Sequence, residues 1–300
     1  MISMLIAQYA LVVAIIFTVL ALGAQILVVT TRQQQTAAQT SRATVSVGDG
    51  PAEYVSSEAP GSAKERKYYF YAVAFTAVAF VLLTAYLVLR MIHTGHGPFA
   101  NQHEFSVAFG WGILLALLFF MWRYKVRTIA LFVLPVVALM LIYATQLDTE
   151  IRPLVPALKN NLLLTFHVGF AVVAYGAACV SFGAAVVYLA LPYLPFKRLP
   201  RPEVLDEVGY RAAAFTFPLL TIMIILGSIW ANVAWGRYWG WDPKETASFV
   251  TWLIYGAYLH ARVTLKWKGT RSAVLLILGF VAVLFTYFGN HFFDSLHSYA

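Results

Sequence analysis

Long apolar runs, separated by shorter polar stretches, follow one another along most of the chain. Each run is close to or above the roughly 18 residues that an α-helix needs to cross the apolar core of a bilayer. The third run is short and the fifth is long. The eight runs cover residues 4–30, 68–92, 105–122, 128–146, 160–194, 213–232, 248–266 and 272–290. This pattern predicts an all-α polytopic membrane protein with about eight transmembrane helices.

Composition agrees with this fold class. The chain is 61% hydrophobic and 11% charged, with a mean hydropathy of +0.73, whereas about 25% of residues are charged in soluble domains. The first run lacks a basic leading segment and a clear cleavage site, so we expect a retained helix rather than a signal peptide. The single cysteine, Cys179, excludes an internal disulfide and a CxxC redox motif.

Basic residues are concentrated in alternating loops. Sixteen of the 21 Lys and Arg residues lie in the loops that follow the first, third, fifth and seventh runs. The positive-inside rule then predicts that these loops are cytoplasmic and that both termini and the remaining loops are on the outer side. The net charge of +8 is therefore a signal of topology and does not indicate a nucleic-acid partner.

One polar segment divides the chain. Residues 31–67 are rich in Gln, Ala, Ser, Thr and Gly and have few apolar anchors, which is typical of a disordered linker. We therefore predict an N-terminal transmembrane helix over residues 1–30, a cytoplasmic linker over residues 31–67, and a membrane domain over residues 68–300.

An aromatic cluster occupies the predicted outer loop between the sixth and seventh runs. Tryptophan and tyrosine gather at membrane interfaces in ordinary proteins, and an interfacial belt is one interpretation. The cluster is denser than a belt requires, and the interleaved Gly236 and Gly240 would let a flat ligand approach the backbone. Its members are Trp230, Trp235, Tyr238, Trp239 and Trp241. The sequence therefore also supports a site for a large planar apolar molecule.

The end of this loop carries the pattern of a helix start. Asp242 is a good N-cap, Pro243 fits the first helical position, and Glu245 stands three residues after the cap. Asp242 is either a helix cap only or a direct ligand contact. Arg237 and Lys244 are either solvated loop charges or a cationic rim, which would suit a planar molecule that bears carboxylates, such as haem.

Haem needs axial ligands, and histidine is the most common one. His167 lies seven residues into the fifth run, and His297 follows the eighth run, so both can reach the space beneath the Trp-rich loop. His260 lies about 18 Å from the outer end of the seventh run, in the inner half of the bilayer. Each is either a buried structural histidine or a haem ligand, although ionisable groups within membranes are usually functional.

The remaining histidines have no ligand spacing. His93, His96 and His103 lie in or near the second outer loop, where we expect surface or loop roles. His291 is a weaker alternative to His297 as an outer ligand, and its role stays open. Tyr175 and Cys179 are most simply packing residues.

A family resemblance rests on several of these segments. The stretch WGRYWGWDPKETASFVTWLIYGAYLHAR (residues 235–262) resembles the WWD signature of haem-handling proteins, and most closely that of the CcsA (ResC) family of cytochrome c biogenesis proteins. GHGPFANQHEF, FHVGFAVVAYG and the terminal LHSY are also similar to that family. The chain departs from the family pattern at two places. Ala247 and Ser248 follow DPKET, where many members have Trp, and His103 occupies a position that is often another residue. Neither removes a histidine ligand.

The resemblance implies a function. CcsA proteins act with CcsB (ResB) as a haem exporter and cytochrome c synthase, so haem b, CcsB and an apocytochrome c with a CxxCH motif are the expected ligand and partners. His167 and His297 match the outer pair of iron ligands, and His260 matches the CcsA half of an inner pair. A thiol-reducing thioredoxin-like protein is a further candidate partner, and the implied location is a bacterial plasma membrane or a thylakoid membrane.

The implied chemistry needs no catalytic side chain from this protein. The two substrate thiols would add to the haem vinyl groups, and the residues expected to bind haem would supply proximity and orientation. The principal alternative is a haem-delivery chaperone of the CcmC type, which does not itself form the thioether bonds. A transporter of another substrate is a more distant alternative.

Overall fold

The computed structural model describes residues 2–43, 62–151, 153–159, 161–194, 200–289, 292–293 and 295–297. Over these residues the regular structure is entirely helical, and each of the eight predicted runs corresponds to one α-helix. The helices are α1 (Ile2–Ala43), α2 (Ala63–Thr94), α3 (Gln102–Tyr124), α4 (Ala130–Thr145), α5 (Asn161–Ala190), α6 (Pro202–Trp235), α7 (Pro243–Val263) and α8 (Thr270–Phe288), with the 3-10 helix η1 (Pro156–Lys159) before α5. The predicted all-α membrane fold is confirmed.

Within the described residues, six helices are long and apolar enough to cross a membrane. They are α1, α2, α3, α5, α6 and α8. The helix α4 has 16 residues, and α7 has 21 residues but is less apolar. The protein is therefore a multi-pass membrane protein, while the count of eight spans stays a prediction for α4 and α7.

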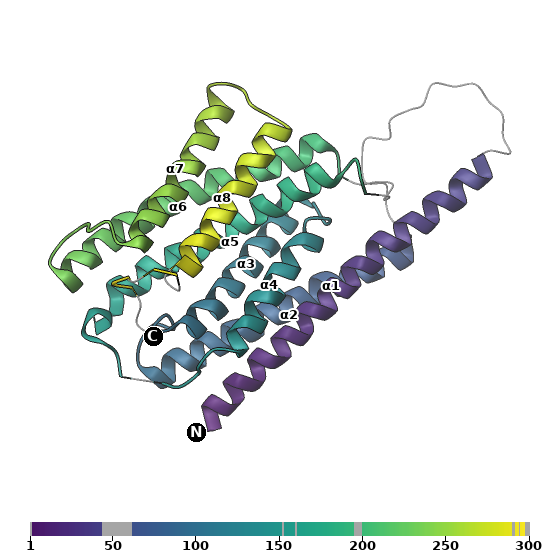
Figure 1. The fold of residues 1–300 in the computed structure, drawn as a ribbon. Helices are drawn as coiled ribbons and strands as arrows, with labels where there is room; N and C mark the ends of the chain where they lie inside the picture. The colour runs from purple at the N-terminus through teal and green to yellow at the C-terminus, as the bar shows by residue number, and fades with distance from the viewer. Residues whose placement is uncertain are drawn as a thin grey trace.

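The helix α5 lies in the middle of the bundle, where it contacts α3, α4, α6 and α8. Figure 1 shows α1 lying along α2 at one side of the molecule, and α6 and α7 at the other. The helices α3 and α5 cross closely because both have glycine at the contact, since a Cβ at Gly176 would lie 2.2 Å from the Gly112 carbonyl oxygen. Small residues allow such approaches between membrane helices.

Two helix boundaries differ most from the predicted ones. The helix α1 continues to Ala43, because the Gln and Ala residues that follow the apolar run favour a helix as well as a linker. The helix α6 begins at Pro202 rather than near residue 213, and proline suits this first position. Residues 44–61, the centre of the predicted linker, lie outside the described residues.

Buried ion pairs fix one end of the bundle. Arg262 pairs with Asp206 between α7 and α6, and Arg32 pairs with Glu65 between α1 and α2. This is the end that the distribution of basic residues predicts to be cytoplasmic. The loops before α3, α5 and α7 gather at the opposite end, where they surround a cavity.

Candidate functional site

A cavity of about 710 Å³ lies at the end of the bundle where the aromatic cluster of residues 230–241, the Trp-rich segment, is found. Its walls come from described residues in the loops before α3 and α5, from the parts of α3, α5, α6, α7 and α8 near this end, and from His297 after α8. This volume lies within the range typical of small-molecule and cofactor sites. Both predicted outer histidines, His167 and His297, line it.

The two histidines have the same ring nitrogen, Nε2, free of protein hydrogen bonds from the described residues. The Nδ1 atom of His167 lies 2.8 Å from the Met223 carbonyl oxygen, and that of His297 lies 2.8 Å from Asp242 Oδ2. Both partners accept hydrogen bonds, so each Nδ1 carries the proton and each neutral ring keeps a lone pair on Nε2. No hydrogen bond from a described residue reaches either Nε2, so both are open to a ligand.

A glycine makes room for the first of these rings. A Cβ atom at Gly227 would lie 2.6 Å from His167 Cε1, so α6 and the imidazole can approach only because this position lacks a side chain. The spacing of the sequence did not indicate this role, because it depends on how α5 and α6 pack.

Trp230 links the two histidines. Its ring centroid lies 6.3 Å from that of His167, in a stacked orientation, and 5.6 Å from that of His297. Trp230 is 2% exposed, and its indole N–H donates to the Ala157 carbonyl at 3.1 Å. The ring of Trp235 packs edge-on against His297 at 4.9 Å. Both tryptophans belong to the last turns of α6 rather than to a loop, so the loop itself is shorter than predicted.

The remaining aromatic residues of the cluster do not share one environment. Trp239 lines the cavity and packs edge-on against Trp241 at 5.7 Å. Tyr238 and Trp241 are 59% and 66% exposed. The structure thus brings Trp230, Trp235 and Trp239 to the cavity or its histidines and turns Tyr238 and Trp241 outward, where an interfacial role is compatible with their exposure.

The predicted helix start is confirmed. Asp242 caps α7 in a complete capping box with Glu245, and Pro243 occupies the first turn. The carboxylate also accepts hydrogen bonds from His297, Ser295 and Leu296. Burial by itself would raise the pKa of Asp242, but these hydrogen bonds hold it well below its usual range.

The two basic residues of the segment occupy different places. Lys244 is half-buried and lines the cavity, and burial lowers its pKa to about 8. Its Nζ atom lies 5.8 Å from the centre of the Phe105 ring. Arg237 is exposed and is not among the residues that line the cavity. The cavity therefore has one cationic group from this pair, and Arg237 is a surface charge.

His260 lies far from the cavity. It is the eighteenth residue of α7, about 25 Å along the helix from Pro243. Its side chain is exposed, and no described residue forms a hydrogen bond with its ring. Val250, Leu253 and Ala257 are exposed on the same side of α7, so His260 belongs to an apolar face of this helix.

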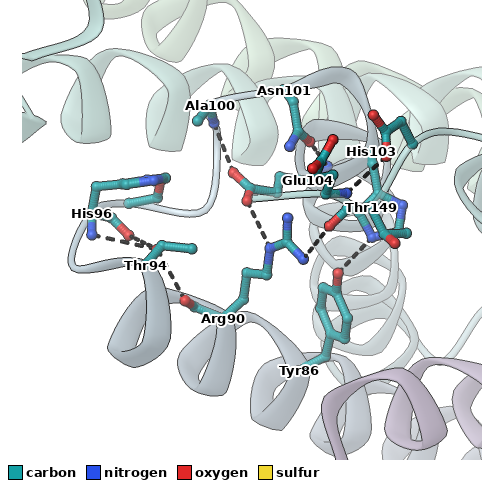
Figure 2. A network of polar contacts seen from close by, with 12 residues as sticks. Tyr86, Arg90, Thr94, His96, Ala100, Asn101, His103, Glu104 and Thr149 are labelled. Carbon is teal, nitrogen blue, oxygen red and sulfur yellow. Dashed lines mark hydrogen bonds and ion pairs between the residues drawn. The ribbon is translucent and has the colours of Figure 1, made fainter. Parts of the chain in front are cut away.

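A buried polar network lies beside the cavity and was not predicted. Figure 2 shows Arg90 of α2 between Glu104 and the Thr149 carbonyl, with distances of 2.8 and 3.0 Å. Glu104 also accepts from the backbone N–H of Ala100 at 2.8 Å. This network fixes the corner between α2 and α3, which forms one wall of the cavity.

The expected surface or loop role was wrong for His103, which lies buried in α3, whereas His96 belongs to the loop between α2 and α3, as expected, but is buried there. His103 is 2% exposed and His96 is 8% exposed. The Nδ1–H of His103 donates to the Ala144 carbonyl at 2.7 Å, and its Nε2 accepts from the Tyr86 hydroxyl at 2.5 Å. His103 therefore joins three helices and has no nitrogen left for a metal. His93 is exposed, and His291 lies outside the described residues.

The donor set limits which metal could bind. The described residues contain no group of three or more His, Cys, Asp or Glu side chains that could hold a bare ion. Two open imidazole nitrogens would suffice for a metal whose other ligands come from a planar macrocycle, as in haem. The walls are largely apolar, and their charged side chains are Lys244, Asp148, Glu150 and Glu245. The half-buried Lys244 also fits such a molecule, because haem carries carboxylates on an otherwise apolar ring.

Comparison with known proteins shows the family. The family model for the cytochrome C assembly protein matches residues 99–297. The cytochrome c biogenesis protein CcsA of Guillardia theta is 35% identical over 264 residues, which cover 79% of this chain and 87% of that protein. The CcsA protein of Gloeobacter violaceus is 32% identical and covers 75% of this chain and 84% of that protein.

This chain belongs to the CcsA family of cytochrome c assembly proteins. The resemblance that the WWD-like segment indicated is thereby confirmed. The cytochrome c haem lyase CcmF has a similar fold, with a TM-score of 0.64 and 18% identity, over 95% of this chain and 46% of that one. The chain thus spans about half of that structure, and this likeness concerns the fold.

Membership of the CcsA family places the protein in cytochrome c biogenesis, as a subunit of the system II cytochrome c synthase. Cytochromes c carry haem attached to a CxxCH motif, so their assembly involves haem. The principal alternative, a CcmC-type chaperone, is not favoured by the relatives that match this chain.

Proposed function

We propose that this CcsA-family protein holds haem b in the cavity beneath the Trp-rich segment, for attachment to the CxxCH motif of an apocytochrome c. The iron would be bound by Nε2 of His167 and Nε2 of His297. The observation that carries the proposal is that both imidazoles line one cavity with Nδ1 hydrogen-bonded and Nε2 open. Such fixed tautomers are typical of metal-binding histidines.

The other cavity residues would orient the ring. Lys244 would pair with a propionate, and Trp230 and Trp239 would cover the porphyrin and exclude water. With Lys244 as its partner, the propionate edge would lie toward the start of α7. The vinyl edge would be the part accessible to the substrate thiols.

Attachment itself requires positioning more than acid or base catalysis. Each thiol of CxxCH adds across a vinyl group, so that a C–S bond forms, the S–H proton goes to the other vinyl carbon, and nothing leaves. The protein would hold the reacting edge at a fixed place, which contributes through proximity and orientation. The substrate histidine would replace one protein imidazole, which weakens binding of the product.

A second haem position would involve His260 and a CcsB-type partner. His260 is exposed on an apolar face of α7 and has no histidine partner among the described residues of this chain. A bis-histidine site at this depth would need its second ligand from another membrane protein. We propose that haem passes from this inner position to the cavity, which faces the periplasm or lumen as the distribution of basic residues predicts.

The test is coexpression with a CcsB-type protein and an apocytochrome c in a host that lacks its own synthase. Haem that remains on the cytochrome after denaturation measures attachment. We expect attachment with the unchanged chain and with His93→Ala, which alters an exposed histidine, and none with His167→Ala or His297→Ala. Normal attachment in both of the latter variants would exclude the proposed site.

A further inference from the structure

The start of α7 and the segment after α8 meet at one carboxylate. Asp242 Oδ1 accepts from the backbone N–H of Leu296 at 2.7 Å, and Oδ2 accepts from Ser295 Oγ and His297 Nδ1, each at 2.8 Å. Fifty-five positions separate Asp242 from His297 in the chain. The described residues 295–297 form no helix, so these hydrogen bonds, with the packing of Trp235, hold them in place.

Hydrogen bonds at the start of α7 also fix the position of the Asp242 carboxylate. Glu245 accepts hydrogen bonds from the backbone N–H of Asp242 at 3.2 Å and from that of Gly240 at 2.8 Å. Asp242 Oδ2 also accepts from the backbone N–H of Lys244 at 3.1 Å. Asp242 thus caps α7 and also accepts a hydrogen bond from a histidine in another part of the chain. Asp242 is 6% exposed.

We infer that Asp242 is a positioning residue for His297: it selects the tautomer with Nδ1–H, directs Nε2 into the cavity, and docks residues 295–297 against the start of α7. This inference rests on the proposed role of His297 as an iron ligand and adds the group that makes it an effective one. Helix capping alone requires only the bond to the backbone of α7, and the three bonds to residues 295–297 are additional.

The charge of Asp242 has a consequence for the metal. A carboxylate that accepts the Nδ1–H of a ligating imidazole makes the ring a stronger electron donor and holds its orientation. Removing this partner typically weakens metal binding by about 10- to 100-fold. His167 has a neutral carbonyl as its partner, so the two imidazoles are unequal: His297 is the more strongly donating one, and its position depends on the Trp-rich segment.

The experiment compares haem affinity and reduction potential in the purified full chain, titrated with haem after depletion. Asn is also a good N-cap, so Asp242→Asn should keep α7 folded from the same residue. We expect Asp242→Asn to weaken haem binding by about 10- to 100-fold and to shift the potential upward, because a negative charge near the iron is lost. Thr246→Ala, which removes another side-chain hydrogen bond at the same helix start, should change neither quantity.

Added imidazole and the second variant Asp242→Ala distinguish an error in the role of Asp242 from an error in the ligand role of His297. Asp242→Ala should bind haem weakly, and free imidazole should restore much of the affinity because it needs no positioning. Should His297→Ala weaken haem binding while both Asp242 variants keep the affinity and potential of the unchanged protein, the inference about Asp242 is overturned and the ligand assignment stands. Unchanged binding in His297→Ala would instead overturn the proposed site.

Discussion

At the scale of single residues, the position of His167 depends on an absent side chain. Gly227→Ala would place a Cβ 2.6 Å from the His167 ring. Overpacking of this kind costs about 1–3 kcal/mol, so we expect haem affinity to fall roughly tenfold or more while the protein still inserts. The check is haem content and affinity after purification. Gly169→Ala, in open space on α5, is the matched control, and equal losses in the two variants would contradict this role.

Lys244 gives the site a predictable pH dependence. Burial lowers its pKa to about 8, so the side chain is cationic below that pH and becomes neutral as the pH rises through it. A bound carboxylate favours the charged form, which moves the transition to a higher pH in the complex. We therefore expect haem affinity to decline with rising pH above about 8.

The substitution Lys244→Met should flatten this profile and weaken binding at neutral pH roughly tenfold, the value of one charge-assisted hydrogen bond. Haem titrations between neutral and alkaline pH measure both effects. Arg237→Met removes an exposed charge outside the cavity and should keep the slope. A slope that survives Lys244→Met would show that another group titrates.

Sequence reasoning selected His167, His297, Trp230 and Lys244, and all four line one cavity. It could do so because residue type and depth along an apolar run are visible without a fold. The second role of Asp242 and the role of Gly227 depend on contacts between segments that are far apart in the chain. His103 was placed wrongly for the same reason, since its partners Tyr86 and Ala144 lie on other helices.

At the scale of helices, the corner between α2 and α3 depends on the ion pair of Arg90 and Glu104, whose side chains are each 1% exposed. Glu104→Gln leaves a buried guanidinium without its counter-charge, and breaking such a pair costs about 3–5 kcal/mol. We expect a clear drop in thermal stability in detergent.

A double variant separates charge from packing at this corner. Arg90→Met with Glu104→Leu removes both charges, and apolar replacements of a buried pair are often tolerated. It should therefore be more stable than Glu104→Gln alone. If the single variant unfolds at the same temperature as the unchanged protein, the pair does not support the cavity wall.

Helix ends were predictable where they carry a local signal. The start of α7 follows from Asp242, Pro243 and Glu245, because a capping box is a short-range pattern. The extension of α1 to Ala43 and the early start of α6 at Pro202 were missed, because apolarity defines the part of a helix inside a membrane and not its polar continuation.

At the scale of the whole molecule, the two proposed haem positions lie at different depths, and the direction of transfer can be tested. If the cavity is loaded through the inner position, His260→Ala should deplete haem at both places. His167→Ala should instead keep the inner haem when a CcsB-type partner is present. Haem stoichiometry of each purified complex is the measurement, and a normally loaded cavity in His260→Ala would mean that haem arrives by another route.

The central claim is that His167 and His297 are the two iron ligands in the cavity of this CcsA-family protein. The most direct measurement is the absorption spectrum and haem content of the purified protein and of His167→Ala and His297→Ala, with and without added imidazole. We expect six-coordinate haem in the unchanged protein, loss of cavity haem in each variant, and partial recovery with imidazole, which can occupy the space of the missing ring. Unchanged haem content and spectra in both variants, without imidazole, would contradict it.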